Sequence, residues 1–125
     1  DDVLFGKLRP YLAKVYLANK DGQALGDIYV LRPNKLILSK FLYYTLLSVR
    51  FIDYVNSSTN GTKMPRANWE FIGAASLCLP TLEEQNQIIK HIDEKWEKID
   101  NLIYKQTKIN KKLKGHQQIV QYHFY

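Results

Sequence analysis

Apolar residues recur every three or four positions over the last third of the chain. They stand at positions 89, 92, 96, 99 and 103, a heptad spacing that is typical of a helix packed lengthwise against another helix. The segment Leu79-Pro80-Thr81-Leu82-Glu83-Glu84-Gln85 precedes them, and its Thr81 and Glu84 match a capping box. The sequence therefore predicts one helix from Thr81 to about Tyr122. Its predicted contact positions are Ile89, Ile92, Trp96, Ile99, Ile103, Gln106, Asn110, Leu113 and Val120.

The contact stripe becomes half polar beyond Ile103, where Gln106, Asn110 and Gln117 occupy its positions. A neighbouring frame through Leu102 and Ile109 is more apolar there, which indicates a local stutter. At about 1.5 Å per residue, about forty residues form a rod of roughly 60 Å. A rod of that length is too long to bury its stripe on the rest of the chain. The predicted helix therefore needs a partner that lies along it.

Shorter apolar runs, separated by turn residues, predict mixed α and β structure before the long helix. Ser39 and Asn68 are the predicted N-caps of two helices, and Asn19-Lys20-Asp21-Gly22 is a predicted hairpin turn. Strands are expected at 3–5, 11–16, 24–25, 27–31 and 76–79, and helices at 40–47, at 50–55 and for one turn after Asn68. The predicted fold class is therefore α+β, with a small mixed domain at 1–79 and one long helix at 80–125.

Composition adds a preference for a partner. The net charge of +6 and the isoelectric point near 9.4 favour a polyanion, with nucleic acid ahead of a membrane surface. The single cysteine, Cys78, excludes an internal disulfide and fits a reducing, cytoplasmic compartment. Five lysines near the end of the long helix match its dipole, so they need no ligand to explain them. Since the chain begins at Asp1 and enters a strand at once, we expect a fragment or a processed product.

Motifs for catalysis fail on geometry or order. The triplet Asp93-Glu94-Lys95 has the composition of a nuclease Asp-x-Lys, but positions i and i+2 of a helix diverge by about 200°. The segment 60–63 has neither the residue order nor the first glycine of a phosphate loop. The three histidines lack the spacing of a zinc helix. The sequence predicts a non-enzyme that holds no metal and no cofactor.

Two stretches, 7–16 and 59–69, combine cations with aromatic and backbone-bending residues. An arginine can clamp a phosphate or the O6/N7 edge of guanine through two hydrogen bonds. Loops on a rigid scaffold are where binding residues concentrate. The predicted DNA contacts are Lys7, Arg9, Lys14, Asn60, Thr62, Lys63, Arg66 and Asn68. In the alternative interpretation Tyr11, Tyr16 and Trp69 serve only to pack the core.

Three segments in this order carry a family resemblance: 2–12 (DVLFGKLRPYL), 61–69 (GTKMPRANW) and 79–85 (LPTLEEQ). Together they resemble the specificity (S) subunit of type I restriction–modification enzymes. The last segment is the most specific of the three, because a long helix follows it directly. Many family members have proline where Thr81 stands.

The resemblance implies part of a DNA target recognition domain followed by a conserved spacer helix. In the family two such units pair their helices antiparallel between the two halves of a split DNA site. The implied partners are double-stranded DNA, the methyltransferase (M) and restriction (R) subunits, and a second copy or half-subunit bound through the helix. Catalysis would lie on the M and R subunits. Family recognition domains are longer than residues 1–79, so part of the base-reading surface would be missing. The alternative is a helix-pairing interaction module without DNA contact of its own.

Overall fold

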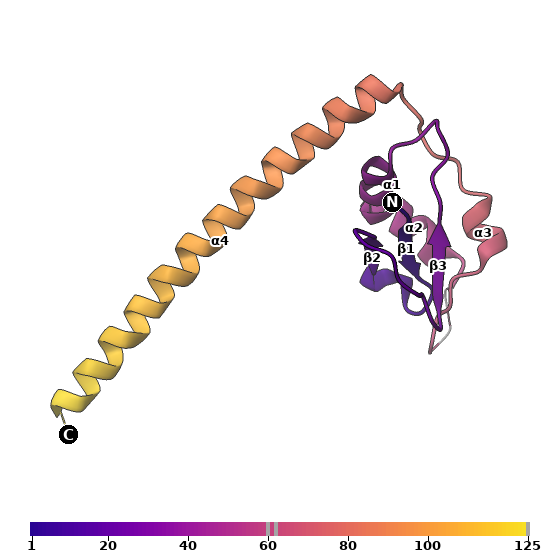
Figure 1. The fold of residues 1–125 in the computed structure, drawn as a ribbon. Helices are drawn as coiled ribbons and strands as arrows, with labels where there is room; N and C mark the ends of the chain where they lie inside the picture. Colours follow the sequence, from indigo (N-terminus) through magenta and orange to yellow (C-terminus); the bar gives the residue numbers. More distant parts are fainter. Residues whose placement is uncertain (60, 62, 125) are drawn as a thin grey trace. The chain divides into compact units, whose positions relative to one another are not determined.

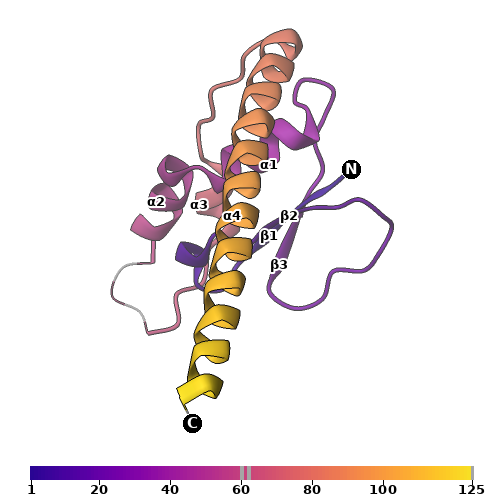
Figure 2. The ribbon, with the colours of Figure 1, turned by 90° about the vertical axis from the view of Figure 1, so that its left-hand side faces the viewer.

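The computed structural model describes residues 1–59, 61 and 63–124, with side chains through residue 116. The chain forms two units, Asp1–Ile89 and Lys90–Tyr125, and each is described by itself. Its elements, shown in Figures 1 and 2, are β1 (Val3–Gly6), the 3-10 turn η1 (Pro10–Leu12), β2 (Val15–Leu17), β3 (Ile28–Leu31), α1 (Ser39–Leu47), α2 (Val49–Ser57), α3 (Trp69–Gly73) and α4 (Leu82–Phe124). The predicted α+β class with one long helix is confirmed. The domain boundary at 79/80 stays a prediction.

The sheet has the order β2-β1-β3, and both outer strands run antiparallel to β1. Val3 lies opposite Leu17 on one side and Leu31 on the other. The predicted hairpin turn at 19–22 is wrong, because β1 separates β2 from β3. The positive φ of this connection is found at Gly26 (φ 75°), four residues beyond Gly22. Neither the strand expected at 24–25 nor the one at 76–79 is present.

The strand expected at 11–16 is wrong in its first half. Pro10 fixes φ and has no N–H to give to a strand ladder, so the chain turns there. The N–H groups of Leu12 and Ala13 donate to the carbonyls of Arg9 and Pro10, each at 2.9 Å. Arg9 (φ 50°) and Ala13 (φ 49°) flank this turn in the left-handed region, an uncommon conformation for side chains of their kind. The strand resumes only at Val15.

The core lies between one face of the sheet and the helices α1 and α2. Val3 and Phe5 alternate inward along β1 and are almost completely buried. The ring of Phe5 meets the ring of Phe51 edge to face at 5.7 Å. The rest of the buried cluster comes mainly from the helices: Leu42, Leu46, Ile52, Val55, Ala67 and Ile72. Period-two burial on β1 and helical periodicity on α2 therefore converge on one core.

Capping agrees with the sequence at two of the three predicted sites. The side chain of Asn68 accepts from the N–H of Glu70 at 2.8 Å and begins α3. Thr81 Oγ1 accepts from the N–H of Glu84 at 3.3 Å and begins α4. Ser39 is not the N-cap of α1, because Leu38 holds that position and the hydroxyl of Ser39 donates to the carbonyl of Asp1.

Gln85, in the first turns of α4, is completely buried within the first unit. Its Nε2 donates to the carbonyls of Leu36 and Pro80, both at 2.9 Å. Its Oε1 accepts from the N–H of Leu38, the N-cap of α1, at 2.8 Å. One amide therefore connects the starts of two helices. None of the described helices is long and apolar enough to cross a membrane.

Candidate nucleic-acid interface

The two basic stretches that the sequence singles out meet in the fold. Leu8 and Arg66 form an isolated antiparallel bridge beyond the end of β1. On its two sides the N–H of Arg9 donates to the carbonyl of Pro65, and the N–H of Ala67 donates to the carbonyl of Lys7, both at 2.8 Å. We call residues 7–9 and 65–67 the joined segments. They place Lys7, Arg9 and Arg66 within one short stretch of paired backbone.

The backbone under Arg66 is firmly held. Its neighbours Pro65 and Ala67 are both buried, whereas Arg66 is exposed. The carbonyl of Ala67 also accepts a hydrogen bond from the hydroxyl of Tyr29 at 3.0 Å, from the adjacent strand β3. This alternation of buried and exposed residues directs the arginine to the surface from a fixed base.

An acidic residue, Asp27, ties the joined segments to the start of β3. Its carbonyl accepts from the N–H of Lys7 at 2.8 Å, and its carboxylate Oδ2 accepts from Nη2 of Arg66 at 3.2 Å. The Arg66 side chain remains 63% exposed and that of Asp27 31%. Sequence reasoning missed Asp27, although the acid stands directly before the strand 28–31.

Aromatic rings lie beside these cations. The ammonium of Lys7 lies 4.3 Å from the centre of the Tyr29 ring, a cation–π contact. The rings of Tyr29 and Trp69 are 5.4 Å apart. Trp69 is 49% exposed, so it does not serve only to pack the core. This edge of the molecule therefore presents cations next to flat apolar surface, a combination that suits phosphates together with bases or sugars.

The remaining predicted contacts have varied surroundings. Lys14, Lys63 and Asn68 are exposed. Asn68 uses its side-chain oxygen to cap α3, so its NH₂ group is the part suited to contact DNA. Asn60 and Thr62 lie outside the described residues. The structure thus brings together Lys7, Arg9 and Arg66, while Lys63 precedes the joined segments by two residues.

The predicted stripe of α4 is largely exposed. Ile89 and Ile92 are partly buried, whereas the stripe residues beyond them are exposed as far as the described side chains extend. Trp96 is 51% and Ile103 59% exposed. The polar positions bond to each other, since Nε2 of Gln106 donates to Oδ1 of Asn110 at 3.3 Å. The side chain of Val120 lies outside the described part of the helix.

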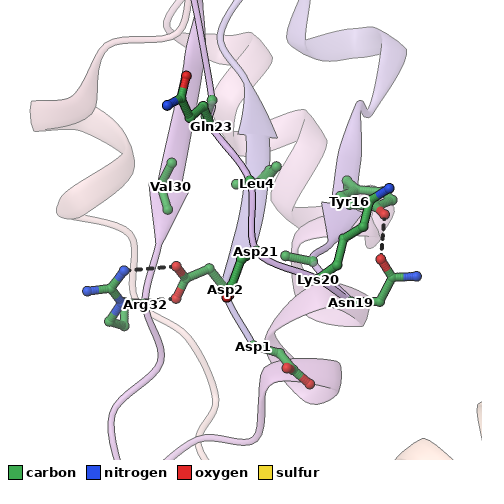
Figure 3. Close-up of a pocket in the computed structure, with 13 residues that line it drawn as sticks. Asp1, Asp2, Leu4, Tyr16, Asn19, Lys20, Asp21, Gln23, Val30 and Arg32 are labelled. Carbon is green, nitrogen blue, oxygen red and sulfur yellow. Dashed lines mark hydrogen bonds and ion pairs between the residues drawn. The ribbon is translucent and has the colours of Figure 1, made fainter.

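The face of the sheet opposite the core carries a hollow of about 770 Å³. Figure 3 shows Leu4, Tyr16 and Val30, one from each strand, together with Lys20 and Asp21 from the segment after β2. At its edge Nε and Nη2 of Arg32 donate to the two carboxylate oxygens of Asp2, both at 3.0 Å. The pKa of Asp2 is lowered below its ordinary value of 3.8. These hydrogen bonds are the main cause, and the positive charge of Arg32 has a smaller effect in the same direction. The side chains that line the hollow carry charges of both signs, so the hollow does not favour the binding of a polyanion.

In the described part of the chain, no group of three or more histidine, cysteine, aspartate or glutamate side chains is placed to hold a metal ion. The features that remain are a basic, partly aromatic edge and an exposed apolar helix stripe.

Comparison with known proteins identifies the class. A model of the type I restriction modification DNA specificity domain matches residues 1–115, nearly the whole chain. The chain therefore belongs to this family. It is also similar to the type I restriction enzyme EcoDI specificity subunit of Escherichia coli, with 29% identity over 92 residues. That match covers 74% of this chain and 20% of the relative, so the chain spans about a fifth of the relative's length.

Proposed function

We propose that this chain is part of a type I specificity subunit that binds double-stranded DNA through the joined segments and has no catalytic activity of its own. The observation that carries the proposal is the Leu8–Arg66 bridge. It gathers two basic segments, nearly sixty residues apart in sequence, on one partly aromatic edge. Family membership supplies the class of ligand, and the bridge supplies a surface for it.

In this proposal the predicted contact residues have different roles. Lys7, Arg9 and Lys63 contact phosphates and fix the register of the protein on the duplex. Arg66 and Asn68 reach toward base edges, and Asn60 and Thr62 stay predicted contacts from the sequence alone. Lys14, exposed before β2, adds a further positive charge. Residues 1–79 then form part of a target recognition domain, and residues 80–125 form the spacer helix.

The long helix provides the second half of the proposal. Its exposed stripe, with Trp96, Ile99 and Ile103, pairs with the same helix of a second copy or half-subunit and sets the distance between two DNA half-sites. The assembled subunit docks the methyltransferase and restriction subunits, which perform methyl transfer and cleavage in the cytoplasm. The hydrogen-bonded pair Gln106–Asn110 interrupts the apolar stripe and limits the registers that the helices can adopt.

The salt dependence of duplex binding tests the electrostatic part. Three phosphate contacts predict that log K falls against log salt concentration with a slope of about −2.7. Replacing Lys63 or Arg9 with glutamine is expected to reduce the size of that slope by about 0.9 each, because one contact is lost. Lys35→Gln is the matched control, since Lys35 is exposed but belongs to neither basic stretch. Equal slopes for all three variants would contradict the proposal.

The alternative function is helix pairing without DNA contact, favoured by the exposed stripe of α4. Combined charge reversal, Lys63→Glu with Arg66→Glu, separates the two functions. Loss of duplex binding with intact self-association supports the DNA-binding proposal. Unchanged duplex affinity with intact self-association favours the alternative.

A further inference from the structure

The described residues of the first unit include two arginine–aspartate pairs of different geometry. Arg32 makes a bidentate contact with Asp2, in which Nε and Nη2 each lie 3.0 Å from a carboxylate oxygen. That arrangement commits one whole edge of the guanidinium to a partner within the protein. Arg66 meets Asp27 through Nη2 and Oδ2 only, at 3.2 Å. Among the described residues this is the one side-chain hydrogen bond that Arg66 makes.

A single contact holds a guanidinium in orientation and leaves most of its donors available. Arginine carries five N–H donors in a planar fork, and the Asp27 contact uses one of them. The other donors remain on a side chain that is 63% exposed. A bidentate contact with the O6 and N7 atoms of guanine requires two donors on one edge. Arg66 retains that capacity, whereas Arg32 has given up one edge.

The backbone of Arg66 is also held in place. The bridge to Leu8 fixes its backbone, and the buried residues Pro65 and Ala67 anchor it on both sides. Asp27 reaches it from a second element, at the start of β3, while its own carbonyl is fixed by the N–H of Lys7. A side chain that is held both at its backbone and at its guanidinium group loses less conformational freedom on binding than an unrestrained side chain.

We propose that Asp27 is a positioning residue that aims Arg66 at a guanine in the major groove. This inference rests on the proposed function, and it names the base class read by one residue of that surface. Asp27 does not itself contact the DNA. It selects the guanidinium orientation in which the fork faces outward, so that Arg66 acts as a specificity determinant and not only as a positive charge.

Charge alone predicts a change in affinity on removal of Asp27 but no change in base preference. A carboxylate beside a phosphate backbone repels it, so Asp27→Ala should increase affinity for every duplex equally if only charge matters. If Asp27 positions Arg66, the same variant binds duplexes in general as tightly or more tightly but discriminates less between bases. Overall affinity and base preference then change in different directions, which a merely structural ion pair would not cause.

The experiment incubates the chain with a pool of short duplexes randomised at consecutive base pairs and sequences the retained fraction. We expect the unaltered chain to enrich guanine at one position. Arg66→Lys, Asp27→Ala and Asp27→Leu should lower that enrichment roughly tenfold, the discrimination ordinarily supplied by one bidentate contact, while retained DNA stays equal or rises for the Asp27 variants. Asp2→Asn is the matched control, since it removes the same charge from the Arg32 pair, and it should keep the guanine preference.

The outcomes separate the two levels of the proposal. Wild-type guanine enrichment in folded Asp27→Ala or Asp27→Leu would overturn the positioning role, as would a chain that binds DNA without enriching guanine. Asp27→Leu keeps a side chain of similar size but has no acceptor for Nη2 of Arg66, so it provides the test if the alanine variant does not fold. If no duplex is retained by the unaltered chain, the proposed DNA-binding function fails, and the inference fails with it.

Discussion

Gln85→Leu is expected to destabilise the first unit strongly although it replaces a polar side chain with an apolar one of similar size. The side chain is completely buried, and its amide makes hydrogen bonds to Leu36, Leu38 and Pro80. Each net hydrogen bond contributes about 1 kcal/mol, and a buried group left without a partner costs about 1–3 kcal/mol. Leu36 is exposed, so water can replace its bond, whereas Leu38 and Pro80 are partly buried. Leaving these two groups unpaired costs about 2–6 kcal/mol in total.

Urea unfolding followed by circular dichroism measures this loss. We expect the midpoint to fall at an unchanged slope, together with a drop in melting temperature of about 10 °C or more. Gln87→Leu is the matched control, because Gln87 stands two positions later in α4 and is exposed. It should change stability by no more than about 0.5 kcal/mol. Equal stabilities of the two variants would refute the assignment of Gln85 as the link between the starts of α1 and α4.

Three further predictions follow from the packing, the charges and the helix stripe. Val55→Ala should cost about 2 kcal/mol or more in urea unfolding, because Val55 is fully buried and the change leaves a cavity; a loss under about 0.5 kcal/mol would contradict the core assignment. Arg32→Gln should raise the pKa of Asp2 toward 3.8 in an NMR titration. Because the folded-state pKa of Asp2 is lowered, the stability that the pair contributes is present above pH 3.8 and is lost as the pH falls through the lowered value. An unchanged Asp2 titration in the variant would count against the pair. Ile99→Lys should weaken self-association in sedimentation equilibrium while Glu97→Lys does not, and equal effects would argue against the proposed pairing face.

Local patterns were sufficient to predict the helices. The capping contact of Thr81 and the heptad spacing of α4 both involve residues only a few positions apart in sequence. The structure forms the helix from Leu82 to Phe124. The same holds for Asn68, whose side chain caps the next turn. The buried role of Gln85 could not be predicted in this way, since its partners Leu36 and Leu38 are nearly fifty residues away in sequence.

Strand pairing was the part that sequence reasoning predicted poorly. The turn residues at 19–22 favoured a hairpin, but the partner of a strand is chosen by tertiary packing. The buried residues Val3 and Phe5 place β1 in the centre, and β2 and β3 pair with it from either side. A strand signal at 11–16 likewise gave way to the restricted φ of Pro10.

The candidate site shows the same division. The sequence predicts Lys7, Arg9 and Arg66 one by one as DNA contacts, because charge and neighbouring aromatic residues are visible in sequence, and that role stays a prediction. Their juxtaposition required the bridge between residues 8 and 66, a non-local contact that no periodicity encodes. Asp27 escaped notice for a related reason, since a lone acid near basic segments gains meaning only from its contact with Arg66.

The central claim is that DNA binds on the joined segments, and amide chemical shifts of the isotope-labelled chain titrated with a short duplex test it directly. NMR detects weak binding and assigns it to residues. We predict shifts concentrated in residues 7–9 and 63–68, spreading to Asp27 and Tyr29 through their contacts with these segments. Shifts confined to the lysines of α4 between residues 105 and 114, or no shifts at low salt, would contradict the account.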